Sequence, residues 1–403
     1  MEIEKRRKKK RSKRNQDWTS LPLEIVELIC KCLTVTDQLH IGSVCKSWFF
    51  CTANKLNIWV PETPWLIENS DRSSQFLFFN NTYQKVYRIY KPFRSLHGSS
   101  IVGSFKGWLF IRNQAKIFIL NPLSRIQVEL PPITTIGFFP PKPFDSIGMP
   151  IPIAFAISTC HKFNPITIIM VTFTGDLAWC NIGDKSWNSY RSEHSRYGNI
   201  IFYNDKIYAI TQDGCNVEIF RPNNESLVLL NSTAHSIHPN IDTNLIRVYL
   251  VECGGKIFVV KRYFSSETMS LTTTFVIMEV QESCNPPRLV HANSLEDHIL
   301  FVADNSIESV HSKHCPRFKS NCIYYIDYSI NFHSGVGLWE FAVTARTMTK
   351  MPFSGTQFFC PCWLLPRFAY ECDRNCKCNY SKWTKRKKRR RKSLQLKTNV
   401  VSS

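Results

Sequence analysis

The 403-residue chain is long enough for two to four domains, and its 43% hydrophobic and 20% charged residues are typical of a globular protein, which excludes a wholly disordered chain. Its formal charge of +20 lies at the two ends: residues 1–14 hold nine Lys or Arg, residues 382–403 hold ten, and residues 15–381 carry 32 bases against 29 acids. The longest apolar stretches are far shorter than the ~20 residues of a membrane-spanning helix, so the sequence predicts no such helix.

The chain begins with a basic run, KRRKKKRSKR, and a second run, KRKKRRRK, lies near its other end. Blocks of like charge repel themselves and cannot bury a core, so both tails are predicted to be disordered. Three interpretations of the tails stay open: nuclear import signals, nonspecific contacts to nucleic-acid phosphates, or solubilising ends without a targeting role. The import interpretation predicts a nuclear protein with a share in the cytoplasm. Its candidate signal residues are Lys5, Arg6, Arg7, Lys8, Lys9, Lys10, Arg11, Lys385, Arg386, Lys387, Lys388, Arg389, Arg390, Arg391 and Lys392.

No secretory signal follows the first basic run, because the next residues read NQDWTS and not an apolar stretch with a small-residue cleavage site. The 16 cysteines are therefore expected to stay reduced. Most of them are expected to act as small apolar side chains in helices and strands.

Residues 20–50 are predicted to form three short helices. Ser20 can cap the first helix, and Pro22 suits its first turn, where a missing N–H costs nothing. Apolar residues then recur at helical spacing, a break follows at TVTD, and Gly42 separates the second helix from the third. So short a segment cannot bury all of its own apolar side chains, so the neighbouring domain or another protein is expected to cover the remainder.

This segment resembles an F-box, whose pattern is Leu-Pro-x-Glu, an apolar helix, a short acidic turn, a Leu helix and then Val-Cys-Lys-x-Trp. The alternative is an ordinary helical cap on the domain that follows. One departure is Gly42, in a stretch that Arg-rich or Leu-rich residues often occupy, and it is expected to loosen the second helix. The matching positions are Leu21, Pro22, Glu24, Leu33, Asp37, Leu39, Val44, Cys45, Lys46 and Trp48.

F-boxes dock on a Skp-type adaptor, which joins them to a cullin and to a RING subunit that carries the ubiquitin-charged enzyme. The resemblance therefore implies that this adaptor covers the apolar surface. Trp48 is expected to supply the large buried anchor of that interface. Carried over by position, the expected adaptor-binding residues are Leu21, Pro22, Ile25, Val44, Cys45 and Trp48.

From about Asn57 onward, short β runs separated by turn residues replace the helical pattern. Strand–turn–strand units that cannot bury their own faces favour radial stacking, and the remaining length at about 40–50 residues per blade predicts an all-β propeller of six or seven blades. A large β-sandwich is the structural alternative. Tight turns are predicted at Asn113–Ala115, Gly175–Asp176, Gly183–Asp184, Asn204–Asp205, Asp213–Gly214 and Gly254–Gly255.

A second resemblance supports the propeller. The motifs PETPWLI (61–67), FKGWLFI (105–111) and IFILNPLSRIQVELPPI (117–133), followed late in the chain by LEDHILFVADNSIESVHSKHCPRFKSNCIYYIDY (295–328) and GVGLWEF (335–341), resemble a plant F-box-associated β-propeller family once known only as a domain of unknown function. The resemblance extends over most of residues 60–365. It implies a fold and a domain order, and it does not imply a ligand.

No catalytic constellation stands out, because the chain lacks a phosphate-cradling Gly-rich loop, a His-Glu-x-x-His helix and a Gly-x-Ser-x-Gly elbow. No cofactor and no metal are therefore expected. The pair His311 and His314 could hold a metal, but surface histidines are the simpler interpretation. Zinc at the close-spaced Cys360, Cys362, Cys372, Cys376 and Cys378 is a further alternative to a final strand followed by idle thiols.

Long connections on a compact scaffold are often functional. Residues 131–153 form a Pro-rich excursion that cannot be a central strand, and residues 221–246 and 281–296 are similar excursions. Propeller loops gather on two rims, so such loops are candidates for reading a target protein, with plain inter-blade connections as the alternative.

The predicted organisation is a disordered basic tail (1–16), an F-box (17–56), a β-propeller (57–370) and a Cys-containing, then basic, disordered tail (371–403). This α+β multidomain chain is expected to be a non-catalytic, substrate-recruiting subunit of an SCF-type cullin ubiquitin ligase, with the adaptor on the F-box and a target protein on the propeller. The alternatives are a nuclear nucleic-acid-associated protein that acts through its tails, and an enzyme with an active site in the propeller channel. Membrane partners are not expected.

Overall fold

The computed structural model divides the chain into two compact units, residues 1–60 and residues 61–403. The description covers residues 20–33, 37, 41, 44–45, 48, 63–68, 75–82, 84–90, 99–123, 126–137, 154–158, 166–193, 195–223, 226–233, 246–264, 271–328, 336–353 and 361–366. Both basic tails, and with them their predicted disorder and import signals, lie outside these residues. Within the described residues, no helix combines the length and the apolar character needed to cross a bilayer.

The first unit contains one fully described helix, α1 (Leu23–Lys31). Pro22 precedes it with φ −54° and accepts the first helical hydrogen bonds at its carbonyl, and Glu24 lies in the first turn, where a negative charge favours the helix dipole. Asp37, Ile41 and Trp48 also have helical backbone. Most residues of the predicted second and third helices lie outside the described part of the chain.

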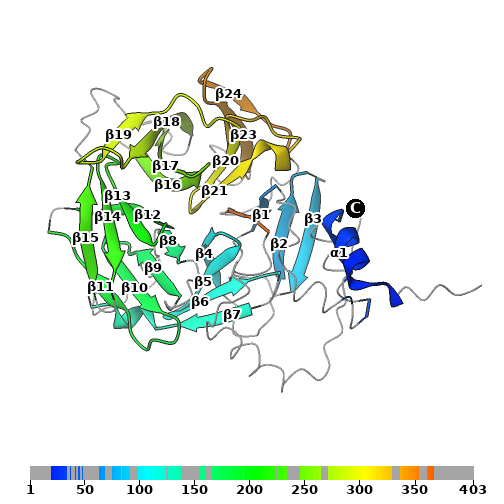
Figure 1. Ribbon diagram of the computed structural model, residues 1–403, viewed down its shortest axis with the longest axis horizontal. Coiled ribbons are helices and arrows are strands. Elements are labelled where there is room, and N and C mark those ends of the chain that lie inside the picture. Colours follow the sequence, from blue (N-terminus) through cyan, green and yellow to red (C-terminus); the bar gives the residue numbers. More distant parts are fainter. Residues whose placement is uncertain are drawn as a thin grey trace, which may run out of the picture. The chain divides into compact units, whose positions relative to one another are not determined.

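The second unit is a six-bladed β-propeller (Figure 1). Each blade is one sheet, numbered here along the chain. The strands of each blade are given in order from the inner to the outer strand. Blade 1 has β25 (Cys362–Leu364), β1 (Trp65–Ile67), β2 (Gln75–Asn80) and β3 (Lys85–Tyr90). Blade 2 has β4 (Ser100–Phe105), β5 (Trp108–Asn113), β6 (Lys116–Asn121) and β7 (Ile126–Leu130), and blade 3 has β8 (Ala154–Ile157), β9 (Thr167–Val171), β10 (Leu177–Asn181) and β11 (Asn188–Tyr190).

The second half of the ring holds three further sheets. Blade 4 has β12 (Tyr197–Tyr203), β13 (Lys206–Thr211), β14 (Val217–Pro222) and β15 (Leu227–Ser232); blade 5 has β16 (Ile246–Cys253), β17 (Lys256–Phe264), β18 (Thr272–Gln281) and β19 (Arg288–His291); and blade 6 has five strands, in the order β21 (Ser306–His311), β20 (His298–Ala303), β22 (Cys322–Tyr328), β23 (Val336–Ala342) and β24 (Thr347–Lys350). Two short 3-10 turns, η3 (Ile133–Thr135) and η4 (Ser312–His314), complete the described elements.

The predicted propeller is therefore confirmed with six blades, and the β-sandwich alternative is wrong. All six predicted turns lie between consecutive strands of one blade. At Gly254 and Gly255, which join β16 to β17, φ is +60° and +81°, a region that glycine enters without steric cost. These turns were predictable because each depends on local residue chemistry.

The apolar cores lie between neighbouring blades. In β9, Ile168 and Met170 pack with residues of blade 2, whereas Ile169 and Val171 pack with residues of blade 4. Successive side chains of a strand point to opposite faces of its sheet, and both faces are covered here. This is why central strands such as IFIL (117–120) are continuously apolar instead of alternating.

The ring is closed by the last described strand, since β25 pairs antiparallel with β1 and sets Trp363 opposite Leu66. The backbone N–H of Trp363 donates to Oγ of Ser306 (2.8 Å), and its indole Nε1 donates to the carbonyl of Val302 (3.1 Å). From blade 2, Oγ of Ser104 donates to the Trp363 carbonyl. The strand β25, which lies some 300 residues after β1 in the sequence, thus joins blades 1, 2 and 6.

A buried ion pair ties blade 5 to blade 6. Nη2 of Arg262 lies 2.6 Å from Oδ1 of Asp327 and also donates to the Ile326 carbonyl, while Nε donates to Oγ1 of Thr272. Both charged side chains are almost fully buried. Removing one partner of such a pair leaves an uncompensated charge in the core, so the network makes the blade 5–blade 6 contact specific.

Replacing Trp363 by Ala is expected to lower the free energy of unfolding by about 3–5 kcal/mol, because the side chain is fully buried and its removal leaves a cavity where three blades meet. Urea denaturation of the full chain, followed by tryptophan fluorescence, measures this loss. Phe173→Ala is the matched control, since Phe173 is 37% exposed and its truncation should change stability by less than about 1 kcal/mol. Equal losses in the two variants would contradict the closing role of Trp363.

Candidate functional site

Among the described residues of the helical unit, Val26, Cys30 and Trp48 form a buried cluster, which is called its core. Val26 and Cys30 lie one turn apart on α1, which places them on one face of the helix. The backbone N–H of Trp48 donates to Sγ of Cys45 (3.5 Å), so that thiol caps the turn that carries the indole. Leu21, Ile41 and Cys45 pack around this core and are half-buried.

Other apolar side chains among the described residues of the unit are exposed. Ile25, Leu28 and Val44 expose 43%, 57% and 55% of their surface, and Pro22 is exposed as well. Large exposed aliphatic side chains grouped in so short a segment are typical of a surface that another protein covers. The unit thus has a core side and an apolar outer side.

The six predicted adaptor-binding residues therefore divide into two groups. Pro22, Ile25 and Val44 are exposed. Trp48 belongs to the core of the helical unit and is only 9% exposed, and Leu21 and Cys45 are half-buried against that core. An anchor for a partner must offer its own surface, so this burial assigns Trp48 to holding the unit together. Leu28, three residues from Ile25 on the same helix, is exposed as well.

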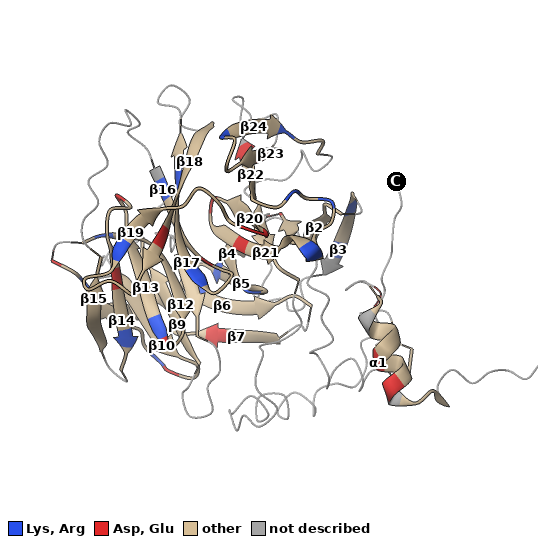
Figure 2. Ribbon diagram, turned by 45° about the horizontal axis from the view of Figure 1, so that its top comes forward, with Lys and Arg blue, Asp and Glu red and all other residues tan. Residues whose placement is uncertain are grey.

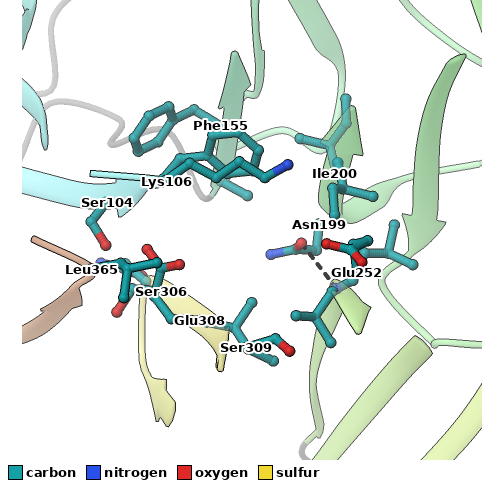
Figure 3. A pocket seen from close by; sticks show the side chains of 17 residues that line it. Ser104, Lys106, Phe155, Asn199, Ile200, Glu252, Ser306, Glu308, Ser309 and Leu365 are labelled. Carbon is teal, nitrogen blue, oxygen red and sulfur yellow. Dashed lines mark hydrogen bonds between the residues drawn. The ribbon is translucent and has the colours of Figure 1, made fainter. Parts of the chain in front are cut away.

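The propeller has a central pocket where the inner strands meet (Figure 3). It has a volume of about 680 Å³ including its open mouth. Polar groups face aliphatic walls across it. The lining residues that carry polar side chains are Ser104, Lys106, Asn199, Glu252, Asn305, Ser306, Glu308 and Ser309.

Backbone contacts hold several of these polar groups in place. Oδ1 of Asn199 accepts from the Leu250 N–H (3.1 Å), which leaves the amide nitrogen directed into the pocket (Figure 3). Oε1 of Glu252 accepts from the Gly255 N–H (3.0 Å). Lys106 sits in the β4–β5 turn with φ +44°, and its ammonium extends over the pocket. With one cation, an amide donor and two carboxylates, the pocket can hold a small polar group.

No metal site emerges from the described residues, where no group of three or more His, Cys, Asp or Glu has suitable geometry. His311 and His314, the one pair considered for a metal, have ring centroids 6.2 Å apart. Burial, together with the charges of Lys313 and His311, lowers the pKa of His314.

Of the five close-spaced cysteines, only Cys362 lies within the described residues. It belongs to β25, as the final-strand interpretation predicts. Burial and the nearby charge of Glu308 raise the pKa of this thiol to about 12. Cys362 is therefore a buried side chain of the closing strand.

The predicted recognition excursions have mixed outcomes. The beginning of 131–153 packs as core: Ile133 and Ile136 are buried, and the indole of Trp187 donates to the Pro131 carbonyl (2.7 Å). Residues 138–153 lie outside the described part. The excursions 221–246 and 281–296 contain outer strands, β15 and β19, that sequence analysis did not assign.

The described strands of the propeller carry residues of both charges. Positions of Lys and Arg are interspersed with positions of Asp and Glu along the drawn ribbon (Figure 2). Several form ion pairs between neighbouring elements, such as Lys206 with Glu282 at 2.6 Å. Mixed charge of this kind does not favour general binding to the phosphates of nucleic acids.

Two family models match the chain. The model described as "KIB1-4 beta-propeller" matches residues 78–344, and the model described as "F-box domain" matches residues 18–57. The propeller match spans most of the strands in Figure 1, and the helical match contains α1 and the residues around Trp48. The order of the two matches is the order of the two compact units.

The relatives are F-box proteins of Arabidopsis thaliana. F-box/kelch-repeat protein At1g57790 is 24% identical over 51% of this chain and 56% of its own length, and probable F-box protein At4g22060 is 26% identical over 47% and 53%. The chain thus spans about half the length of these relatives. Putative F-box protein At4g17565 is 23% identical over 87% of this chain and 95% of its own length.

Among solved structures, a protein of unknown function from Bacteroides caccae overlaps 75% of this chain and 99% of its own length, at 9% identity and a TM-score of 0.36. We base no argument on a similarity at this level.

Trp48→Ala is expected to speed hydrogen exchange of the α1 amides by at least about tenfold, because it removes the largest side chain of the helical core. Ile25→Lys is the matched variant, since it alters an exposed residue of the same helix and should leave exchange unchanged. Mass spectrometry on the full chain measures both. An equal effect of the two variants would contradict the division into a core side and an exposed side.

Proposed function

We propose that this chain, a plant F-box protein that belongs to the KIB1-4 beta-propeller family, recruits target proteins to an SCF-type cullin ubiquitin ligase. A Skp-type adaptor binds the helical unit and links it to a cullin and a RING subunit. The propeller holds the target. The observation that supports this proposal best is the exposed apolar side of the helical unit, which carries Ile25, Leu28 and Val44.

The proposed mechanism is proximity. A target lysine held near the ubiquitin donor has a raised effective concentration, so the F-box protein itself need not break or form a bond. The propeller suits this role because closure of the ring makes it a rigid platform with a central pocket and loops on two rims. We therefore assign it a non-catalytic role.

The double variant Ile25→Lys/Val44→Lys is expected to weaken binding of a purified Skp-type adaptor by about 100-fold or more, because each lysine places a charge in an apolar interface. Isothermal titration calorimetry on the full-length chain measures the change. Val86→Lys on the propeller is the control, since Val86 is exposed to a similar extent.

This pair of surface substitutions tests the adaptor surface more directly than Trp48→Ala does. Trp48→Ala disturbs the core of the helical unit and would lose binding for an indirect reason. If the double variant binds the adaptor as tightly as the unaltered chain while Val86→Lys does too, the exposed side is not the adaptor surface. The proposed function then loses its main support.

We also propose that the basic tails direct the protein to the nucleus. Removal of residues 1–14 and 382–403, which together carry 19 Lys and Arg, is expected to shift a fluorescent fusion from the nucleus to the cytoplasm. Microscopy of plant cells measures the shift. If instead the truncation leaves location unchanged and abolishes a salt-sensitive affinity for DNA, the tails act as nucleic-acid contacts.

A further inference from the structure

The outer strand of blade 4, β15 (Leu227–Ser232), exposes three consecutive aliphatic side chains. Val228, Leu229 and Leu230 are 47%, 49% and 38% exposed. They make up half of the six large hydrophobic side chains that are exposed among the described residues of the propeller unit. The strand reads LVLLNS and carries no charge.

The outer strands of the other blades are protected in ways that β15 is not. An outer strand presents unpaired backbone groups, and charged side chains or short length normally prevent other chains from pairing with it. β11 is short, with three residues. The other outer strands all carry exposed charged residues: Lys85 and Arg88 in β3, Glu129 in β7, Arg288 in β19 and Lys350 in β24.

Both faces of β15 offer apolar surface. Val228 lies opposite Arg221 of β14, and Leu229 lies opposite Phe220, so the two exposed side chains point to opposite faces of the sheet. A partner that rested on one face would cover only one of them. A strand added alongside β15 would contact both and would also pair with its outer backbone edge, which pairs with no other described strand.

The same chain shows that a blade can accommodate a fifth strand. In blade 6, β24 pairs with β23 on the outside of the sheet, with Phe341 opposite Met348. Blade 4 ends one strand earlier, at β15, among the described residues. An outer strand position that is filled in blade 6 is therefore open in blade 4.

The size and charge of the edge indicate its occupant. Three half-exposed aliphatic side chains offer far less area than the roughly 800 Å² per partner that two globular proteins bury in a stable complex, so a short segment fits better than a second copy of this chain. Arg221 is exposed on the Val228 face and forms no ion pair with any described residue. It favours an acidic residue in that segment.

We propose that β15 docks an extended segment of the target protein, which joins blade 4 as a fifth strand. The segment has consecutive β-branched or aromatic residues, one covering Val228 on one face and the next covering Leu229 on the other, with an acidic residue on the face of Arg221. The source of the segment rests on the proposed function, because a target protein is what the propeller of a ligase adaptor holds. The pairing itself depends only on the exposed edge.

The test begins with panning a phage-displayed library of random decapeptides on the purified full-length chain. Selected sequences are then synthesised, and their affinities are measured by fluorescence anisotropy. Enrichment of consecutive β-branched or aromatic residues with an acidic flank is expected. Leu229→Lys should weaken these peptides by at least about tenfold, since it buries a charge against apolar side chains.

Two control variants define the site. Val290→Lys changes a residue of similar exposure (39%) on β19, and peptide affinity should stay within about twofold. Arg221→Glu should weaken acid-flanked peptides and strengthen otherwise identical peptides with a lysine in place of the acid. Peptide binding should also slow hydrogen exchange in residues 227–232.

Two results would overturn the inference. One is the absence of any selected peptide whose binding Leu229→Lys weakens more than Val290→Lys. The other is hydrogen exchange in β15 of the isolated chain that is already as slow as in the central strand β13, which would show that the chain covers its own edge. Binding of the Skp-type adaptor is measured for each variant as well. If the chain binds peptides at β15 but does not bind the adaptor, the proposed function is wrong and the docking edge still stands.

Discussion

The pairing of β25 with β1 is the interaction on which the propeller depends. A ring of blades buries its apolar faces only if the last blade meets the first, and here the two ends of the propeller sequence form one sheet. Trp363 adds hydrogen bonds to blades 2 and 6 at the same point. Loss of that strand would expose the faces of two blades and the core between them.

Closure of the ring determines where function can reside. Side chains of the middle strands fill the spaces between blades and are unavailable to partners. What remains is the central pocket, the loops and the outer edges of the sheets. The helical unit differs, because its few residues bury only a small core and leave apolar side chains outward. So small a unit cannot bury all of its apolar side chains by itself.

The features that could be predicted from sequence are local ones. The turn at Gly254–Gly255 and the start of α1 at Pro22 depend on residues that are neighbours in the chain. The strand order of blade 6, in which β20 and β22 run parallel, could not be predicted, because it depends on which distant strand satisfies each backbone edge. The sequence predicts β15 only as part of the connection 221–246, because a short apolar run such as LVLL cannot be assigned to a strand or a helix from its pattern alone.

The candidate site was predictable in part for the same reason. The F-box pattern identified the segment that carries Ile25 and Val44, but a sequence pattern does not show which side of a helix is buried. The burial of Trp48 against Val26 emerges only from the fold. A large aromatic residue serves equally well as a core side chain or as an interface anchor, and only its surroundings distinguish the two roles.

The central claim is that the helical unit meets the adaptor while the propeller stays free for a target. Hydrogen exchange of the full-length chain, with and without a purified Skp-type adaptor, tests it most directly. The account predicts slower exchange confined to the helical unit around α1, with every strand of the propeller unchanged. Slower exchange across the blades, or none in the helical unit, would contradict it.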